Sequence, residues 1–399
     1  MKIGILTFHS QLNYGGVLQC WALQTALEKM GHEVVVIDRW LDADNFLLER
    51  GYPKWGLKHW ARFCLRTALG LGDINGWLRV RRTKRFLKER LKLTSYHFVE
   101  WKDAPQELGV DLLVVGSDQV WHCGDFGDPR VYLLEGAPSI PAIAYAASFG
   151  FANYPPFLNE SSHDKIEAVT VYMAGLKRFK AISCREAEGV KLCGQLDISA
   201  VHVLDPTLLL DVSEWSSLAS PIRTGARRRL VCYFMSVDVE DALPELLRFA
   251  ESENCEITVL LNDIYPIPAP NNMEKMRRWW QLLRYRWSHC LNVFDSAGPR
   301  EFVNAMANAD FVLSDSFHAL MFSVIFRKNV RILKPQNKFR AKMFSRITEM
   351  ARHMTGPAVS SDVMTALDSF RHNESSAIDK EWLAEQQKQS FDFLRQNIG

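Results

Sequence analysis

The stretch ADFVLSDSFHALMFSVIFRKNVRIL, Ala309 to Leu333, contains a strand, a turn, a helix and a second strand. The apolar run Phe311 to Leu313 predicts a buried strand. The polar residues Ser314 to Ser316 follow, and each is suited to begin a helix. The helix that continues to Phe326 is apolar almost all round, so we expect it to be buried. Because Val330 to Leu333 predicts another strand, the pattern is typical of a parallel sheet whose strands alternate with helices.

His318 stands in the first turn of this predicted helix, at the carboxyl end of a strand. Open α/β sheets bind ligands at that edge, and the amides of a helix start favour an anion. An imidazole beside an anion can transfer a proton near neutral pH. A histidine that only fills a polar pocket or donates to a carbonyl explains the position equally well. Its position alone therefore leaves a catalytic and a structural role open.

The composition indicates a soluble globular protein of two domains. The chain has 399 residues, 47% of them hydrophobic and 24% charged, and a single core seldom extends over so many residues. The net charge of +2 does not indicate a nucleic-acid partner. Eight cysteines without a CxxC pair predict reduced thiols in the cytoplasm. With neither a signal peptide nor an apolar run of about 18 residues, we expect at most peripheral contact with the inner face of a membrane.

The amino-terminal residues predict a β-α-β unit. Lys2 to Phe8 and Glu33 to Asp38 read as strands, and apolar residues at helical spacing lie between them. Gly15 and Gly16 precede that helix and either let a ligand approach the backbone or only form a tight turn. A dinucleotide site is not favoured, because the loop lacks GxGxxG.

Three further loops follow predicted strands, and we expect them at the same sheet edge. The first, after Asp111 to Val115, contains Ser117, Asp118 and Gln119, and the second begins at Ser148. The third presents Arg185, whose planar guanidinium could grip a carboxylate or a phosphate. It could equally form a structural ion pair with Glu186 or another acid.

Two basic segments stand apart from this pattern. Between Lys58 and Lys92 the only acids are Asp73 and Glu89, and apolar residues supply another side, which predicts a helical insertion at about residues 41–102. The second segment, Lys275 to Trp287, is rich in arginine and tryptophan. A solvated or partly buried face is one explanation, and attraction to anionic lipid or to a phosphate-bearing acceptor is the other.

The expected domain organisation has three parts. Residues 1–212 form an amino-terminal Rossmann-like domain that contains the insertion. Residues 213–229, rich in Ser, Arg, Gly and Pro, form a linker. Residues 230–399 form a second Rossmann-like domain with carboxyl-terminal helices.

Six segments in order along the chain resemble the polysaccharide pyruvyl transferase family. They are NYGG with its helix (Asn13 to Leu27), VVGSDQVW (Val114 to Trp121), AASFG (Ala146 to Gly150), ISCRE (Ile182 to Glu186), DPT (Asp205 to Thr207) and SDSFHAL (Ser314 to Leu320). The resemblance implies two Rossmann-like domains facing a cleft, a GT-B-like fold. It also implies an enzyme that transfers a pyruvyl group from phosphoenolpyruvate to two hydroxyls of a sugar. The product is a cyclic ketal on a glycan or a lipid-linked oligosaccharide.

The resemblance also implies residue roles. The histidine matching His318 is the expected acid or base, and no metal, organic cofactor or nucleic acid is needed. The expected substrate-binding residues are Arg185, Asn13, Gly15, Gly16, Ser117, Asp118, Gln119, Ser148, Ser316 and Phe317.

The sequence departs from the family motif at Ser316, because relatives have Arg-x-His where this chain has Ser316-Phe317-His318. One donor-binding cation is therefore missing, and Lys328, Arg331 or Arg340 are candidate substitutes. Two other functions stay open, namely a GT-B glycosyltransferase that uses a nucleotide-sugar donor and a non-catalytic glycan-binding protein of the same pathway.

Overall fold

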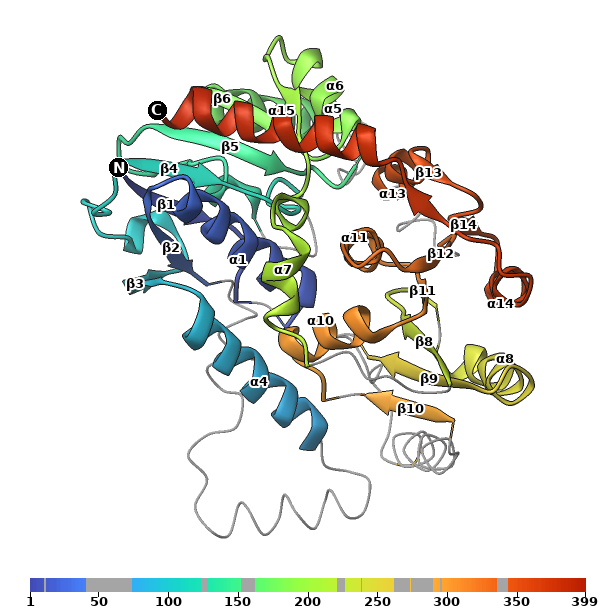
Figure 1. The fold of residues 1–399 in the computed structure, drawn as a ribbon. Helices are drawn as coiled ribbons and strands as arrows, with labels where there is room; N and C mark the ends of the chain where they lie inside the picture. Colours follow the sequence, from blue (N-terminus) through green and yellow to red (C-terminus); the bar gives the residue numbers. More distant parts are fainter. Residues whose placement is uncertain are drawn as a thin grey trace, which may run out of the picture.

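The computed structural model describes residues 1–10, 12–40, 74–122, 128–151, 162–220, 227–237, 239–261, 273, 290–294, 296–335 and 344–399. The basic segment Lys275 to Trp287 lies outside these ranges, as do residues 41–73 of the predicted insertion. Within them, two parallel sheets, each flanked by helices, form two domains (Figure 1).

The first sheet has seven parallel strands in the order β3-β2-β1-β4-β5-β6-β7. Its central strands are buried on both faces, which explains the continuous apolar runs LLVV in β4 and AIAYAA in β5. The strands are β1 (Lys2–Leu6), β2 (Glu33–Arg39), β3 (Leu93–Phe98), β4 (Leu112–Val115), β5 (Ala142–Ala147), β6 (Ala181–Cys184) and β7 (Val201–His202). The helices between them are α1 (Tyr14–Lys29), α4 (Ile74–Arg90), α5 (Ser162–Leu176) and α6 (Ala187–Gln195), with 3₁₀ turns η2 (Trp101–Asp103) and η3 (Pro129–Val131).

The second sheet has six strands in the order β10-β9-β8-β11-β12-β14. Its strands are β8 (Arg228–Tyr233), β9 (Cys255–Leu260), β10 (Leu291–Phe294), β11 (Phe311–Ser314), β12 (Asn329–Leu333) and β14 (Val359–Ser360). The helices are α8 (Val239–Ser252), α10 (Pro299–Asn308), α11 (Phe317–Ile325), α13 (Ser345–Ala351) and α14 (Val363–Arg371). The strand–helix–strand unit predicted from Ala309 to Leu333 is confirmed as β11, α11 and β12.

The predicted helical insertion at 41–102 is not helical to its end, because residues 93–98 form a strand. The helix α4 ends at Arg90, and β3 then pairs in parallel with β2 at the edge of the first sheet. Thr94, Tyr96 and Phe98 favour a strand here, because β-branched and aromatic residues fit a half-buried pleated surface.

The chain passes between the domains twice. After the 3₁₀ turn η4 (Pro206–Leu209), α7 (Val212–Ser216) occupies the start of the predicted linker. The small antiparallel pair β13 (Met354–Thr355) and β15 (Ala377–Ile378) precedes the last helix, α15 (Lys380–Ile398).

The last helix, α15, lies against the first sheet although the sequence assigned it to the second domain (Figure 1). The Oγ of Ser390 accepts a hydrogen bond from the amide of Leu204 at 2.9 Å. The side-chain amide of Gln387 donates to the carbonyl of Leu208 at 2.6 Å. Phe393 and Leu394 are buried in a core that extends over both domains. Among the described helices, none is both long and apolar enough to cross a membrane.

Candidate functional site

The candidate site lies where strand order reverses in both sheets. In the first sheet β1 pairs with both β2 and β4, and in the second β8 pairs with both β9 and β11. The loops at the carboxyl ends of such strands form the usual ligand site of open α/β sheets. In this protein the loops after β1, β4 and β6 meet the start of α11 from the other domain.

Arg185, directly after β6, is the centre of a buried ion-pair cluster. Its guanidinium lies 2.9 Å from Oδ1 of Asp118, 3.2 Å from Oδ2 of Asp205 and 3.6 Å from Oε2 of Glu186. The arginine is only 5% exposed. From the sequence, Arg185 could bind a ligand or form an ion pair with Glu186 or another acid. In the structure it lies at ion-pair distance from Glu186 and also from Asp118 and Asp205.

Two carboxylates of this cluster, those of Asp205 and Asp118, have fixed positions. Asp205 accepts hydrogen bonds from the amide of Thr207 at 3.0 Å and from its hydroxyl at 2.8 Å. The hydroxyl of Ser117 lies 3.3 Å from the other oxygen of Asp205. Asp118 accepts from the amide of Gln119 at 2.9 Å. The acids thus hold Arg185 in one orientation.

The ionisation of two of these acids is pushed in opposite directions. Burial raises the pKa of Glu186, and Arg185 opposes this without cancelling it. Burial acts on Asp118 in the same sense, but Arg185 and then His318 outweigh it, so the pKa of Asp118 lies below its usual range. Opposite shifts in neighbouring carboxyls are typical of sites that divide proton donation from charge stabilisation.

His318 enters the cluster from the second domain. It is 8% exposed, and its Nε2 lies 3.8 Å from Oδ2 of Asp205. In the described structure this nitrogen is buried without a hydrogen-bond partner. Burial lowers the pKa of His318, although Asp205 and Asp118 act in the opposite sense. The imidazole is therefore mostly neutral at pH 7 and able to accept a proton.

Gly15 provides the space for this histidine. A Cβ atom at Gly15 would lie 2.0 Å from Nδ1 of His318, so no side chain fits there without a shift. The sequence left open whether the glycine admits a ligand or forms a turn, and in the structure it admits the imidazole. Gly16 has more room, because a Cβ there would lie 3.4 Å from the nearest atom, Oδ2 of Asp118.

Phe317 joins two arginines at the site. The Cζ of Arg185 lies 4.9 Å from the centroid of its ring, and the Cζ of Arg346 lies 5.2 Å from the same centroid. Arg346 belongs to α13, in the second domain, and sequence reasoning missed it. No motif marks this residue, because it lies far along the chain from His318 and reaches the site only through the fold.

The remaining predicted site residues mainly stabilise the loops. Asn13 caps α1 by accepting from the amide of Gly15 at 3.0 Å. Ser148 braces the loop after β5, since its amide donates to the carbonyl of Asp118 and its hydroxyl accepts from the amide of Gly150. Gln119 is buried beside the same loop, and Ser316 is buried at the start of α11. Roles of these residues in substrate binding remain predictions.

Of the three proposed substitutes for the missing arginine, Arg331 is bound elsewhere. Its guanidinium donates to the Ser369 hydroxyl at 2.6 Å and to the carbonyl of Glu374 at 2.7 Å, far along the chain from the site loops. Lys328 lines a separate cavity at the end of α11. Arg340 lies outside the described residues.

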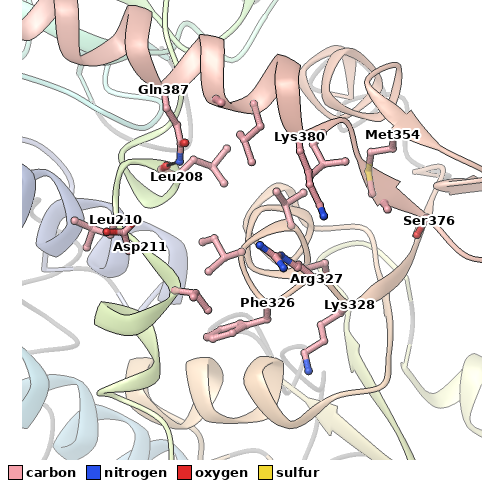
Figure 2. A pocket seen from close by; sticks show the side chains of 18 of the residues that line it. Leu208, Leu210, Asp211, Phe326, Arg327, Lys328, Met354, Ser376, Lys380 and Gln387 are labelled. Carbon is pink, nitrogen blue, oxygen red and sulfur yellow. Dashed lines mark hydrogen bonds between the residues drawn. The ribbon is translucent and has the colours of Figure 1, made fainter.

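That separate cavity has a volume of about 890 Å³ and lies between α7, α11 and α15 (Figure 2). Figure 2 shows Arg327 and Lys328 at the end of α11 and Lys380 at the start of α15. Neither His318 nor Arg185 lines it. The cavity is thus distinct from the ion-pair cluster.

Comparison with known proteins identifies a family and a fold. The family model described as polysaccharide pyruvyl transferase matches residues 13–337. No curated protein matches the chain significantly.

Among solved structures, the UDP-GlcNAc 2-epimerase from Neisseria meningitidis bound to UDP-GlcNAc is 10% identical, with a TM-score of 0.52 over 98% of this chain and 94% of that one. The UDP-GlcNAc 2-epimerase from Methanocaldococcus jannaschii is 12% identical, with a TM-score of 0.47 over 93% and 92%. MurG from Acinetobacter baumannii is 9% identical, with a TM-score of 0.39 over 98% and 94%. At 10% identity the likeness to the Neisseria meningitidis enzyme concerns the fold alone, and the fold is GT-B-like, as predicted.

Proposed function

Because the chain belongs to the polysaccharide pyruvyl transferase family, we propose that it transfers a pyruvyl group from phosphoenolpyruvate to a sugar. The acceptor is a surface polysaccharide or its lipid-linked precursor, and two of its hydroxyls form a cyclic ketal with the pyruvyl carbon. The observation that carries the proposal is His318, which is buried beside Asp205 and whose Nε2 has no hydrogen-bond partner among the described residues. It is an available proton acceptor at the edge where both sheets are expected to bind ligands.

The reaction requires one proton donor and one acceptor. A proton added to the methylene carbon of phosphoenolpyruvate makes C2 electrophilic, and the first sugar hydroxyl bonds to C2 and loses its proton. The bond between C2 and the phosphate oxygen then breaks, and the second hydroxyl bonds to C2 and loses its proton. One proton is thus taken up at carbon and two are released from oxygen, and the extra proton leaves on the phosphate as hydrogen phosphate.

We assign the acceptor role to His318 and the donor role to Glu186. Burial keeps His318 neutral near pH 7, which suits a base. Burial also raises the pKa of Glu186, which favours its protonated form more than that of an exposed glutamate. Arg185 lies beside Glu186, with its Nε 3.6 Å from Oε2 of the glutamate.

The experiment is a phosphate-release assay with phosphoenolpyruvate and a panel of lipid-linked glycans. We expect release only when phosphoenolpyruvate and an acceptor are both present, with a mass gain on the glycan that matches a pyruvyl ketal. In parallel, phosphoenolpyruvate should raise the unfolding midpoint, because a ligand that binds only the folded state stabilises it. A rise with UDP and none with phosphoenolpyruvate would indicate a glycosyltransferase. Glycan binding without turnover of any acceptor would indicate a binding protein.

A further inference from the structure

Arg346 is a cation that the site leaves without an anion. Its side chain is partly exposed as a whole, but its Nε and Nη1 atoms are buried and have no hydrogen-bond partner in the described structure. Arg185, in contrast, has three carboxylates within ion-pair distance. Arg346 therefore has two N–H-bearing nitrogens available for a ligand, whereas the guanidinium of Arg185 already lies among carboxylates.

An unpaired buried guanidinium costs stability, because water no longer solvates its N–H groups and no acceptor replaces it. Most buried polar groups in proteins are hydrogen-bonded, so each exception needs a reason. A bound ligand is such a reason, since a residue that is unfavourable without a ligand becomes favourable when the ligand supplies the missing acceptor.

The surroundings of Arg346 indicate the charge of that ligand. Its guanidinium and that of Arg185 both lie over the ring of Phe317, the residue next to His318. Burial, together with the charge of Arg185, lowers the pKa of Arg346 to about 10, so it stays charged at neutral pH. Asp118 and Asp205 are hydrogen-bonded to Arg185. The nearby acids attract Arg346, but none of them accepts a hydrogen bond from its Nε or Nη1 in the described structure, so these two nitrogens are left for an anion from outside the protein.

We propose that Arg346 binds an oxyanion group of the donor, its phosphate or its carboxylate, beside His318. The identity of the donor rests on the proposed function, whereas the anion site does not. The arginine on α13 would then supply the cation that the family motif lacks at Ser316. In this account Arg185 organises the acids, and Arg346 takes the anion.

The test is Arg346→Met, which keeps an unbranched apolar stem and removes the charge. Titration calorimetry on the full chain measures binding of phosphoenolpyruvate, inorganic phosphate and oxalate. We expect phosphoenolpyruvate to bind about ten- to a hundredfold more weakly, as for a lost charge-assisted hydrogen bond. If only the binding of inorganic phosphate is lost, Arg346 holds the phosphate of the donor. If only the binding of oxalate is lost, it holds the carboxylate. The unfolding midpoint without ligand should stay the same or rise, because the variant removes two buried nitrogens that have no hydrogen-bond acceptor in the described structure.

Arg331→Met is the matched control, because Arg331 is a buried arginine of the same domain whose guanidinium has several partners. It should lower the unfolding midpoint and leave anion binding unchanged. The proposal is overturned if Arg346→Met behaves like this control, or if the wild-type protein binds none of the three anions. If phosphate binding depends on Arg346 but phosphoenolpyruvate is not turned over, the proposed reaction is wrong and the anion site stands. Turnover with an unchanged KM in Arg346→Met would keep the reaction and reject the site.

Discussion

At the residue scale, Gly15 and His318 act as a pair across the domain boundary. The imidazole occupies the space that a side chain at Gly15 would need, with Nδ1 2.0 Å and Cγ 2.3 Å from the Cβ position. A methyl group there must displace either the ring or the domain that carries it. The glycine thus sets the position of the proposed base.

Gly15→Ala should lower kcat/KM by about a hundredfold, because a displacement of roughly 1 Å at a reacting group has an effect of this size. Gly194→Ala in α6 is the control, since a Cβ there would meet no atom within 4 Å. Steady-state kinetics on both variants check this. Equal activities would mean that the imidazole moves without consequence.

His318→Gln should reduce turnover by about 10²–10⁴-fold, the usual contribution of a general acid or base. The unfolding midpoint should change little, because Nε2 has no hydrogen-bond partner to lose in the described structure. Kinetics and thermal unfolding on one preparation separate the two roles. A lower midpoint with turnover preserved per folded molecule would make His318 a structural residue.

The pH profile gives an independent check on His318. Since burial lowers its pKa from 6.5, the neutral form persists below that value, and the acid limb of kcat/KM should lie below pH 6.5. The free energy of unfolding depends on pH in the same direction, falling as the pH falls. The unfolded chain takes up the proton more readily, so the contribution of His318 is present above pH 6.5 and is lost as the pH falls through the folded-state pKa. An acid limb above pH 6.5 would contradict the assignment.

The sequence predicted some of these residues and not others for a physical reason. His318, Arg185 and Gly15 lie in turns that follow buried strands, and the parallel-sheet pattern places such turns at one edge. The position of Arg346 depends on how α13 packs against the first domain, which no local pattern encodes. The same holds for α15, because an amphipathic helix shows that one face is buried but not against which sheet.

At the element scale, α4 divides its basic residues between two faces. Arg82 turns towards the second domain, where its Nη1 donates to the carbonyl of Ser296 at 2.6 Å and its Nε lies 3.4 Å from Glu301. The exposed residues of the helix include four at i, i+3, i+4 and i+7, which share one face, namely Arg81, Lys84, Arg85 and Lys88. Of these two faces of α4, the second is the one available to a membrane.

We expect salt-sensitive binding to anionic vesicles through this face. Removing three charges in Arg81→Gln/Lys84→Gln/Lys88→Gln should weaken binding about a hundredfold, at roughly 1 kcal/mol per cation. Cosedimentation at low and high salt measures it. The matched control replaces three exposed lysines elsewhere, Lys177, Lys180 and Lys191, and should bind like the wild-type protein. Unchanged binding in the first variant would make the α4 face a solvated surface.

At the scale of the whole molecule, the two domains are closed on each other. The hydroxyl of Tyr14, from α1, donates to the carbonyl of Leu261 in the second domain at 2.8 Å. Its ring lies 5.1 Å from that of Phe302 and 5.5 Å from that of Tyr233. With His318 and Arg185 each less than a tenth exposed, a sugar can reach them only when the domains separate.

Tyr14→Phe keeps the ring packing and removes the hydrogen bond, so it should weaken closure by about 0.5–1.5 kcal/mol. Amide hydrogen exchange in α11 should become up to about tenfold faster, while β4 and β5 stay as protected as in the wild-type protein. Exchange that is unchanged in α11 would show that the bond does not hold the domains together.

The two passages of the chain between the domains define a hinge. One runs outward through α7 and the other returns between β15 and α15, so the second domain is an insertion tethered at both ends. A domain held at two points rotates about the line that joins them. Both passages contribute to the wall of the cavity in Figure 2, the first through Val212 and Ser213 and the second through Ile378 and Lys380. We therefore expect the cavity to lie near this axis and His318, which does not line the cavity, to lie away from it. Filling it with Ala384→Trp should therefore obstruct the rotation and lower turnover without changing any group at the site, and normal turnover in that variant would place the axis elsewhere.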